Sequence, residues 1–305
     1  MPHTRFISHS FYCLRGKVGL LYHKAFVMKS ILYITDLYYE AKGRNYPEED
    51  LYITSQLKEH FNLLICHPQQ AIGFVEVADL IIVRNSGPVI YYQEYFNEFL
   101  SVVNESSMAI FNSMDGKADM HGKQYLLELT QKQYPVIPTI DNIEELSVLG
   151  SAPHYILKPK LGADSIGMKI VAKSAISQHD LTDMLIQPFV PFVYEASFYY
   201  LNGQFQYALY APDKKKRWEL QEFIPNDTDL AFAQKFIAWN NMDWGIQRVD
   251  ACRLDDSSWL LLELEDLNPF LSLDKLSEVR KKDFMENFIS AIRQQQEFLV
   301  SNEED

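Results

Sequence analysis

The sequence is poor in cysteine, in positive charge and in long apolar runs. Its 305 residues include three cysteines, which are widely spaced and follow neither a metal-ligand pattern nor a disulfide framework. Sparse cysteine is typical of a reducing compartment, so we expect a cytoplasmic protein. Lys and Arg number 28 against 41 Asp and Glu, and the resulting net charge of -13 disfavours nucleic-acid binding. Because no apolar run approaches the roughly 18 residues of a membrane helix, we also expect no membrane association.

The composition is that of a folded chain. The hydrophobic fraction of 47% is ordinary for a globular protein, and the length suffices for two or three domains. The first 28 residues are basic and aromatic, and their charges interrupt any apolar core of a signal peptide. We expect residues 1–28 to be an N-terminal extension, either disordered or the product of a mis-set start, with folding beginning near Met28.

Strands and helices alternate in the first part of the chain. The apolar pattern predicts strands at 30–36, 63–66, 80–83 and 108–111, and helices at 48–60 and 91–100. Such alternation predicts a parallel α/β sheet. Ligands collect at the carboxyl ends of the strands in such sheets, which places Arg84, Asn85 and Ser86 near a possible site.

In the second part of the chain, glycine and proline interrupt the predicted strands. Its predicted strands are 156–157, 168–171, 184–187, 195–201, 205–210, 244–254 and 258–265, and its predicted helices are 121–131, 230–240 and 276–300. The Asn202-Gly203 pair predicts a tight hairpin. The fold class is therefore a parallel α/β unit followed by a larger α+β unit.

Three carboxylates fall on the last two predicted strands. Asp250 lies in the first strand, and Glu263 and Glu265 lie in the second, where residues two apart face the same side. A hairpin turn at 255–258 could bring Asp250 alongside the glutamates. Converging carboxylates repel one another unless a cation neutralises them, and Mg²⁺ prefers such oxygen ligands. The pattern predicts a metal site, with an acidic edge strand facing water as the alternative.

A lysine and a glycine-containing loop follow an earlier strand. Lys158 ends the strand, and the loop after it contains Gly162, Ser165 and Gly167. Glycines let backbone N–H groups approach phosphates, and the lysine supplies positive charge. An ordinary hairpin would look similar. Lys123 is a weaker candidate, because a lone helix lysine is usually solvated.

These motifs together resemble the ATP-grasp superfamily, specifically its carboxylate–amine/thiol ligases with a glutathione synthetase-like ATP-binding fold. The resemblance rests on the order Lys158-Pro159, a small-residue loop, and a carboxylate-lined hairpin ending in Asn268-Pro269, and it spans about residues 110–275. It implies nucleotide-binding roles for Lys123, Lys158, the loop Gly162, Ser165 and Gly167, the hinge residue Gln187 and the ribose-binding Glu195. It implies metal ligation by Asp250, Glu263 and Glu265, and a place near phosphate for Arg248.

The sequence differs from the superfamily pattern at the metal ligands, and it also carries a basic cluster that the superfamily pattern makes relevant. Many members carry Glu-x-Asn at the metal, whereas this sequence has Glu263-Leu-Glu265 with Asn268 three residues later. Either Glu265 or Asn268 could complete the ligand set. Basic residues after the hinge reach the γ-phosphate or the substrate carboxylate in this superfamily, which makes Lys214 and Arg217 catalytic candidates. A solvated charged face is the alternative for that cluster.

The implied architecture is an α/β pre-ATP-grasp domain (29–110), a central lid subdomain (111–190) and a metal-binding subdomain (191–305). The implied enzyme uses ATP and Mg²⁺ or Mn²⁺ to convert a small-molecule or peptide carboxylate into an acylphosphate. An amine or thiol acceptor then attacks, releasing ADP and phosphate. A phosphotransferase on the same scaffold and a non-catalytic nucleotide-binding protein are the alternatives. A homodimer is left open.

Overall fold

The computed structural model of this chain describes residues 28–39, 46–84, 89–106, 108–162 and 166–303. The predicted N-terminal extension up to residue 27 lies outside the described residues. So do Asn85 and Ser86 of the predicted strand end, and Ser165 of the predicted glycine loop.

The first part of the chain forms the predicted parallel sheet. Its strand order is β2-β1-β3-β4, with β1 (Ser30–Ile34), β2 (Asn62–Cys66), β3 (Leu80–Val83) and β4 (Ile110–Phe111). Helices α1 (Tyr46–Leu57) and α2 (Gln93–Ser106) and the 3₁₀ helices η1 (Pro68–Val77) and η2 (Val89–Tyr92) pack with it. The first strand ends at Ile34, two residues earlier than predicted, and the side chains of Thr35 and Asp36 beyond it contact Asp50 and Tyr92.

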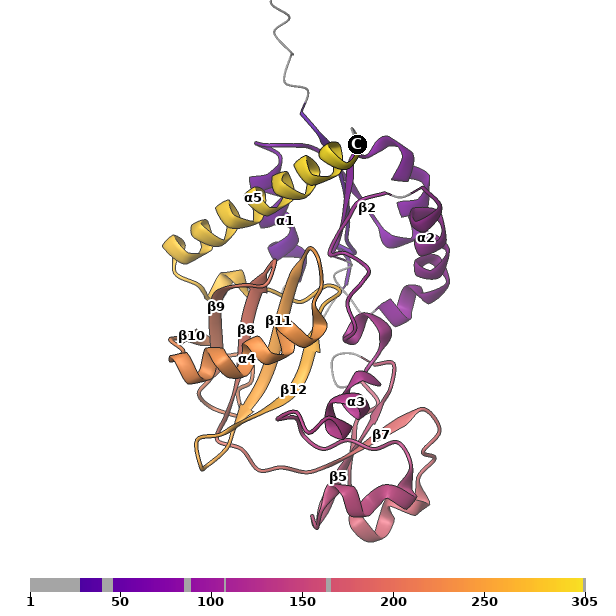
Figure 1. Cartoon of the computed structure of the whole chain (residues 1–305), viewed down its shortest axis with the longest axis vertical. Coiled ribbons are helices and arrows are strands. Elements are labelled where there is room, and N and C mark those ends of the chain that lie inside the picture. Colours follow the sequence, from indigo (N-terminus) through magenta and orange to yellow (C-terminus); the bar gives the residue numbers. More distant parts are fainter. Residues whose placement is uncertain (1–27, 40–45, 85–88, 107, 163–165, 304–305) are drawn as a thin grey trace, which may run out of the picture.

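A small antiparallel sheet forms a separate lobe at the bottom of Figure 1. Its order is β6-β5-β7, with β5 (His154–Pro159), β6 (Lys169–Ala172) and β7 (Met184–Pro188). The 3₁₀ helices η4 (Ile143–Leu149) and η5 (Lys173–Gln178) pack on it and give the lobe its own apolar core. The chain enters this lobe along an extended segment, in which Val136 still pairs with Leu261 and Ile140 already pairs with Ile186.

The last sheet is antiparallel and has the order β10-β9-β8-β11-β12. Its strands are β8 (Tyr194–Leu201), β9 (Gln204–Ala211), β10 (Gln221–Phe223), β11 (Ile246–Arg253) and β12 (Trp259–Glu265). The predicted hairpin joins β8 to β9, and Asn202 and Gly203 have φ angles of 47° and 74° at its turn. Such positive φ values at both turn positions are what the Asn-Gly pair favours.

Three helices complete the fold: α3 (Tyr125–Gln131), α4 (Asp227–Asn240) and α5 (Glu278–Glu303), with the 3₁₀ turns η3 (Asp119–His121) and η6 (Leu273–Lys275). The helix predicted from residue 121 begins four residues later, because Gly122 has a φ of 88° and lies against the Lys160 carbonyl. Helix α4 begins earlier than predicted, because Asn226 and Asp229 form a capping box there.

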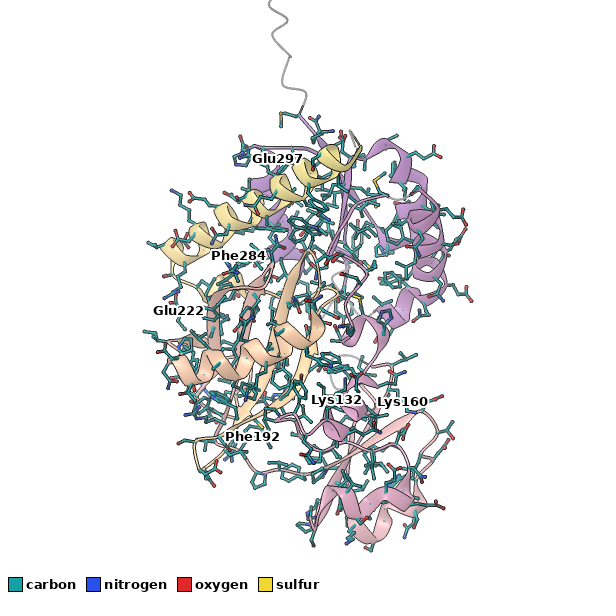
Figure 2. The ribbon with its side chains drawn as sticks, in the orientation of Figure 1. Lys132, Lys160, Phe192, Glu222, Phe284 and Glu297 are labelled. Carbon is teal, nitrogen blue, oxygen red and sulfur yellow. The ribbon has the colours of Figure 1, made fainter. Side chains whose placement is uncertain are left out.

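The two faces of the antiparallel sheet have different neighbours. Helices α3 and α4 pack on one face, and α5 lies over the other together with the parallel sheet (Figure 1). Phe284 of α5, marked in Figure 2, packs edge-on against Tyr207 with ring centroids 5.5 Å apart. One apolar core therefore joins the parallel sheet, α5 and the antiparallel sheet, so packing crosses the predicted domain bounds. Those bounds stay a prediction.

Across the described residues, every helix is too short or too polar to cross a membrane.

Candidate active site

The β11–β12 hairpin brings the three predicted carboxylates onto one face of the antiparallel sheet. Asp250 lies opposite Glu263, and Arg248 lies opposite Glu265. On the other side of β11, Asp250 lies opposite Ser197 of β8, whose hydroxyl donates a 2.6 Å hydrogen bond to it. The expected convergence of acidic side chains is therefore present in the fold.

The predicted explanation of how three carboxylates can lie close together was incomplete. The sequence predicts that a divalent cation relieves the repulsion, but the chain's own cations pair with all three carboxylates. Arg248 pairs with Asp250 and Glu265, and Lys123 pairs with Glu263. In the part of the chain that the structure describes, no three His, Cys, Asp or Glu side chains are arranged to hold a metal ion.

Arg248 is the buried centre of this network. Its Nε and Nη2 donate to the two oxygens of Asp250 at 2.9 and 2.8 Å, and its Nη1 donates to the carbonyl of Phe270 at 2.9 Å. Burial opposes its charge, but the carboxylates of Asp250 and Glu265 outweigh burial and raise its pKa above the usual value. Such a two-pronged pair fixes both partners in place.

The two candidate nucleotide lysines lie close to each other where the lobe meets the body. The Lys123 backbone N–H donates to the carbonyl of Lys160 at 2.8 Å. Burial lowers the pKa of Lys123, although nearby carboxylates including Asp119 and Glu265 act against this. Burial and the Lys123 charge lower the pKa of Lys158 to about 7. Among the described residues, Lys158 has no hydrogen-bond or ion-pair partner, so its ammonium group is available to an anion.

Two glycines of the loop after Lys158 lie against the Pro159 ring. Gly167 has a φ of 76°, and a Cβ there would lie 2.9 Å from the Pro159 ring, so a side chain would be strained and crowded. Gly162 lies at ordinary contact distance from the same ring. The loop can thus approach closely to whatever lies beside the end of β5.

Gln187 and Glu195 have partners within the protein. The Gln187 side-chain amide donates a 2.8 Å hydrogen bond to Thr139 inside the lobe. Glu195 of β8 pairs with Arg217, whose Nη2 lies 3.1 Å from it. Burial raises the pKa of Glu195, and Arg217 partly offsets the effect.

A cleft of about 130 Å³, partly open to solvent, covers the acidic face of the sheet. Five of the predicted site residues line it: Glu195, Arg217, Arg248, Asp250 and Glu263. The wall opposite comes from the segment after β12, which contributes Phe270, Ser272 and Lys275. Lys214 lies apart from the cleft lining, and its ammonium group is 3.4 Å from the Phe192 carbonyl. Asn268 is half-buried in the segment between β12 and the cleft wall.

Two buried groups hold this wall: Arg84, which the sequence placed near a possible site, and Glu49, which sequence reasoning missed. Arg84 is buried and donates to the Pro269 carbonyl at 2.8 Å. Glu49 accepts the backbone N–H groups of Leu271 and Leu273 at 2.8 and 3.0 Å, and pairs with Arg84. The predicted strand end at Arg84 therefore supports the cleft wall from behind rather than lining the cleft.

Asp266, the residue after β12, was also missed. It is wholly buried and faces away from the cleft. A signal was present, because strand alternation puts Leu264 and Asp266 on the face opposite Glu263 and Glu265, and an acid on a core-facing position needs partners.

Comparison with known proteins shows which fold this is. No family model and no curated protein matches the sequence. D-cycloserine synthetase DcsG is similar in structure, with a TM-score of 0.66 and 18% identity over 88% of this chain and 99% of that one. D-alanine–D-alanine ligase from Bacillus anthracis complexed with ATP gives 0.63 and 14% over 91% and 100%. The chain has the ATP-grasp fold.

A third ATP-grasp structure is similar over almost its whole length. The ATP-grasp ligase PsnB, complexed with a phosphomimetic variant of a minimal precursor, Mg and ADP, gives a TM-score of 0.59 and 13% identity over 87% of this chain and 97% of that one. The ATP-grasp architecture therefore accounts for both the parallel sheet and the two antiparallel sheets of this protein.

Proposed function

We propose that this chain is an ATP-dependent ligase that activates a carboxylate as an acylphosphate and joins it to an amine or thiol, releasing ADP and phosphate. The observation that carries the proposal is Lys158, which is partly buried beside Lys123, has no ion-pair partner among the described residues and lies next to a cleft lined by carboxylates. A buried ammonium group without a partner is costly to keep, so it indicates a ligand of opposite charge. The similar ATP-grasp ligases support the same conclusion.

Each predicted residue has a role in this proposal. Lys123 and Lys158 bind the phosphates, and Gly162, Ser165 and Gly167 cover them. Gln187 lies in the strand against the base, although its side chain would have to leave Thr139 to contact it. Glu195 binds the ribose by exchanging its contact with Arg217. Arg217 and Lys214 are then free to reach the γ-phosphate or the substrate carboxylate.

The oxygen donors of the hairpin fit Mg²⁺, or Mn²⁺, in kind. Asp250, Glu263 and either Glu265 or Asn268 would hold the ion, which would supply charge that offsets the phosphates during transfer. Lys123 and Arg248 neutralise these carboxylates within the protein, so the ion needs the phosphates as additional ligands. Arg248 keeps Asp250 oriented throughout, because its fork occupies both oxygens of that carboxylate.

Magnesium should therefore bind well only together with the nucleotide. We expect calorimetric titration to give weak binding of Mg²⁺ alone, and at least roughly tenfold tighter ATP binding when Mg²⁺ is present. Glu263→Gln should remove most of that magnesium effect. The matched control is Glu219→Gln, which loses an exposed partner of Lys216 away from the hairpin. Equal ATP affinity with and without Mg²⁺ would contradict the metal assignment.

Product analysis separates ligation from phosphotransfer. A ligase yields ADP, free phosphate and a new amide or thioester, whereas a phosphotransferase leaves the phosphoryl group on its product. The acceptor screen should pair small and peptide carboxylates with amines and thiols, because the similar structures include both a D-alanine–D-alanine ligase and a precursor complex. Phosphorylated acceptor as the stable product would overturn the ligase proposal.

ATP binding should be accompanied by proton uptake at about pH 8. The pKa of Lys158 is about 7, so this side chain is mostly neutral at that pH without nucleotide. Phosphate favours the charged form and raises this pKa, so Lys158 takes up a proton on binding. Titrations in buffers of different ionisation enthalpy measure the uptake. Lys158→Arg should abolish it, because arginine stays charged throughout; unchanged uptake in that variant would assign the proton to another group.

A further inference from the structure

The segment between β4 and α3 carries Lys123 and is hydrogen-bonded along its length to the antiparallel sheet and to the end of α4. At its start, Asn112 donates to the carbonyls of Ile246 and Asp266 at 2.6 and 2.7 Å and accepts the Ile246 N–H at 2.9 Å. Further along, the Lys117 N–H donates to the buried Asn240 side chain at 2.5 Å. These contacts join residues more than a hundred positions apart in the sequence.

The buried Asp266 carboxylate makes the last contacts before Lys123. Its Oδ2 accepts the Ala118 N–H and its Oδ1 accepts the Met120 N–H, both at 2.9 Å. Asn240 donates to Oδ2 at 3.1 Å, and the Asp266 N–H donates to Asp119 at 2.6 Å. Because one carboxylate accepts two backbone N–H groups that are two positions apart, the segment has little freedom to slide along the sheet.

Gly116 permits this close approach. A Cβ at this position would lie 2.3 Å from Oδ2 of Asp266, a distance that no side chain could hold without displacing the carboxylate or the segment. The contact between Asp266 and this segment therefore requires a residue without a side chain at position 116.

Strand β12 and the residue that follows it therefore determine the positions of both the acidic groups and the lysine of the site. Glu263 faces the cleft and pairs with Lys123, while Asp266, three residues further, faces the other way and holds the backbone leading to Lys123. The Lys123 N–H is meanwhile bonded to Lys160 of the small lobe. The position of Lys123 between lobe and sheet thus depends on the Asp266 contacts.

We propose that Asp266 is a positioning residue, which holds the segment 116–123 so that the Lys123 ammonium group is placed for the nucleotide phosphates. The role rests on the proposed nucleotide function of Lys123. Asp266 itself touches no ligand. A purely structural Asp266 would lower stability without any specific link to Lys123, so the two roles differ in how the effects of substitutions combine.

A double-mutant cycle on magnesium-ATP affinity tests the proposal. Asp266→Asn leaves an amide where at least one backbone N–H had an acceptor, and should weaken ATP binding about tenfold. Loss of a carboxylate near an anion site would by charge alone strengthen binding, so weakening reports displacement. Lys123→Met should weaken binding roughly 30-fold, and the double variant should also show roughly 30-fold rather than ~300-fold weakening. Asp256→Asn, which alters an exposed aspartate of the β11–β12 loop, is the matched control and should bind like the wild type.

The outcomes separate this inference from the proposed function. Losses that multiply in the double variant, or an Asp266→Asn variant that binds like the wild type, would overturn the positioning role alone. Wild-type protein that binds no ATP, or a Lys123→Met variant with unchanged affinity, would overturn both. If circular dichroism shows that Asp266→Asn does not fold, Gly116→Ala replaces it in the cycle, because it displaces the same segment while keeping every charge. The same lack of additivity with Lys123→Met is expected.

Discussion

Replacing Arg84 with methionine should lower the free energy of unfolding by about 3–5 kcal/mol, because it leaves buried carboxylates without their cation. The Arg84 guanidinium lies 3.1 Å from Glu49 and 3.2 Å from Asp50, and all three side chains are buried. Burial already raises the pKa of Glu49 to about 7 despite Arg84 and two backbone N–H donors. Without Arg84, Asp50 would keep its hydrogen bonds from Tyr33 and Thr35 but would have lost the cation that balances its charge. Urea-induced unfolding measures the change.

A surface arginine provides the control for that experiment. Arg280 pairs with Glu222 at 3.0 Å in a partly exposed position, so Arg280→Met should change the free energy of unfolding by at most about 1 kcal/mol. Adding Glu49→Gln to Arg84→Met should recover part of the loss, since it removes one stranded charge. An Arg84→Met loss no larger than that of the surface control would show that the buried group does not hold the cleft wall.

Replacing Lys158 with methionine should weaken magnesium-ATP binding roughly 100-fold, equivalent to ~2.7 kcal/mol for one buried charged contact to phosphate. The nucleotide-free protein should keep or gain stability, because a desolvated ammonium group that has no ion-pair partner among the described residues is replaced by an apolar side chain of similar length. Calorimetric titration gives the affinity, and thermal unfolding without nucleotide gives the stability. Opposite signs for binding and stability are the signature of a residue kept for its ligand.

Lys132→Met is the matched control for that substitution. Lys132, labelled in Figure 2, directly follows α3 and forms an exposed pair with Glu128. It should leave ATP affinity within about twofold of the wild type, because an exposed helix pair contributes little and has no path to the cleft. If Lys158→Met binds ATP as tightly as Lys132→Met does, the proposed nucleotide site is wrong.

Local sequence patterns predicted most of the fold, because they act over a few residues. Apolar runs gave the parallel strands, and the Asn202-Gly203 pair gave its hairpin through the positive φ values that both residues tolerate. The missed elements were the short β10 and the 3₁₀ helices, which lack a strong periodic signal. Helix α3 began late because Gly122 packs against a lobe that is remote in sequence.

The candidate site likewise has features that the local sequence predicted and features that became apparent only in the folded structure. Alternation along two strands joined by a short turn determined that Asp250, Glu263 and Glu265 share one face, since register in a hairpin follows from the turn. Nothing local could show that Lys123 pairs with Glu263, which lies 140 positions later. The resemblance suggested a role for Lys123, but its partner became apparent only in the folded structure.

The sequence by itself therefore determined the α/β and α+β architecture, the acidic hairpin and the lysine-glycine loop. These follow from side-chain periodicity and turn chemistry, which act between neighbours along the chain. Only the tertiary structure decided how the charges are balanced: Arg248 across the hairpin carboxylates, Arg84 behind the cleft wall, and Asp266 beneath the segment that carries Lys123. Burial makes each of these polar groups depend on a partner, and the packing of distant elements chooses which partner it meets.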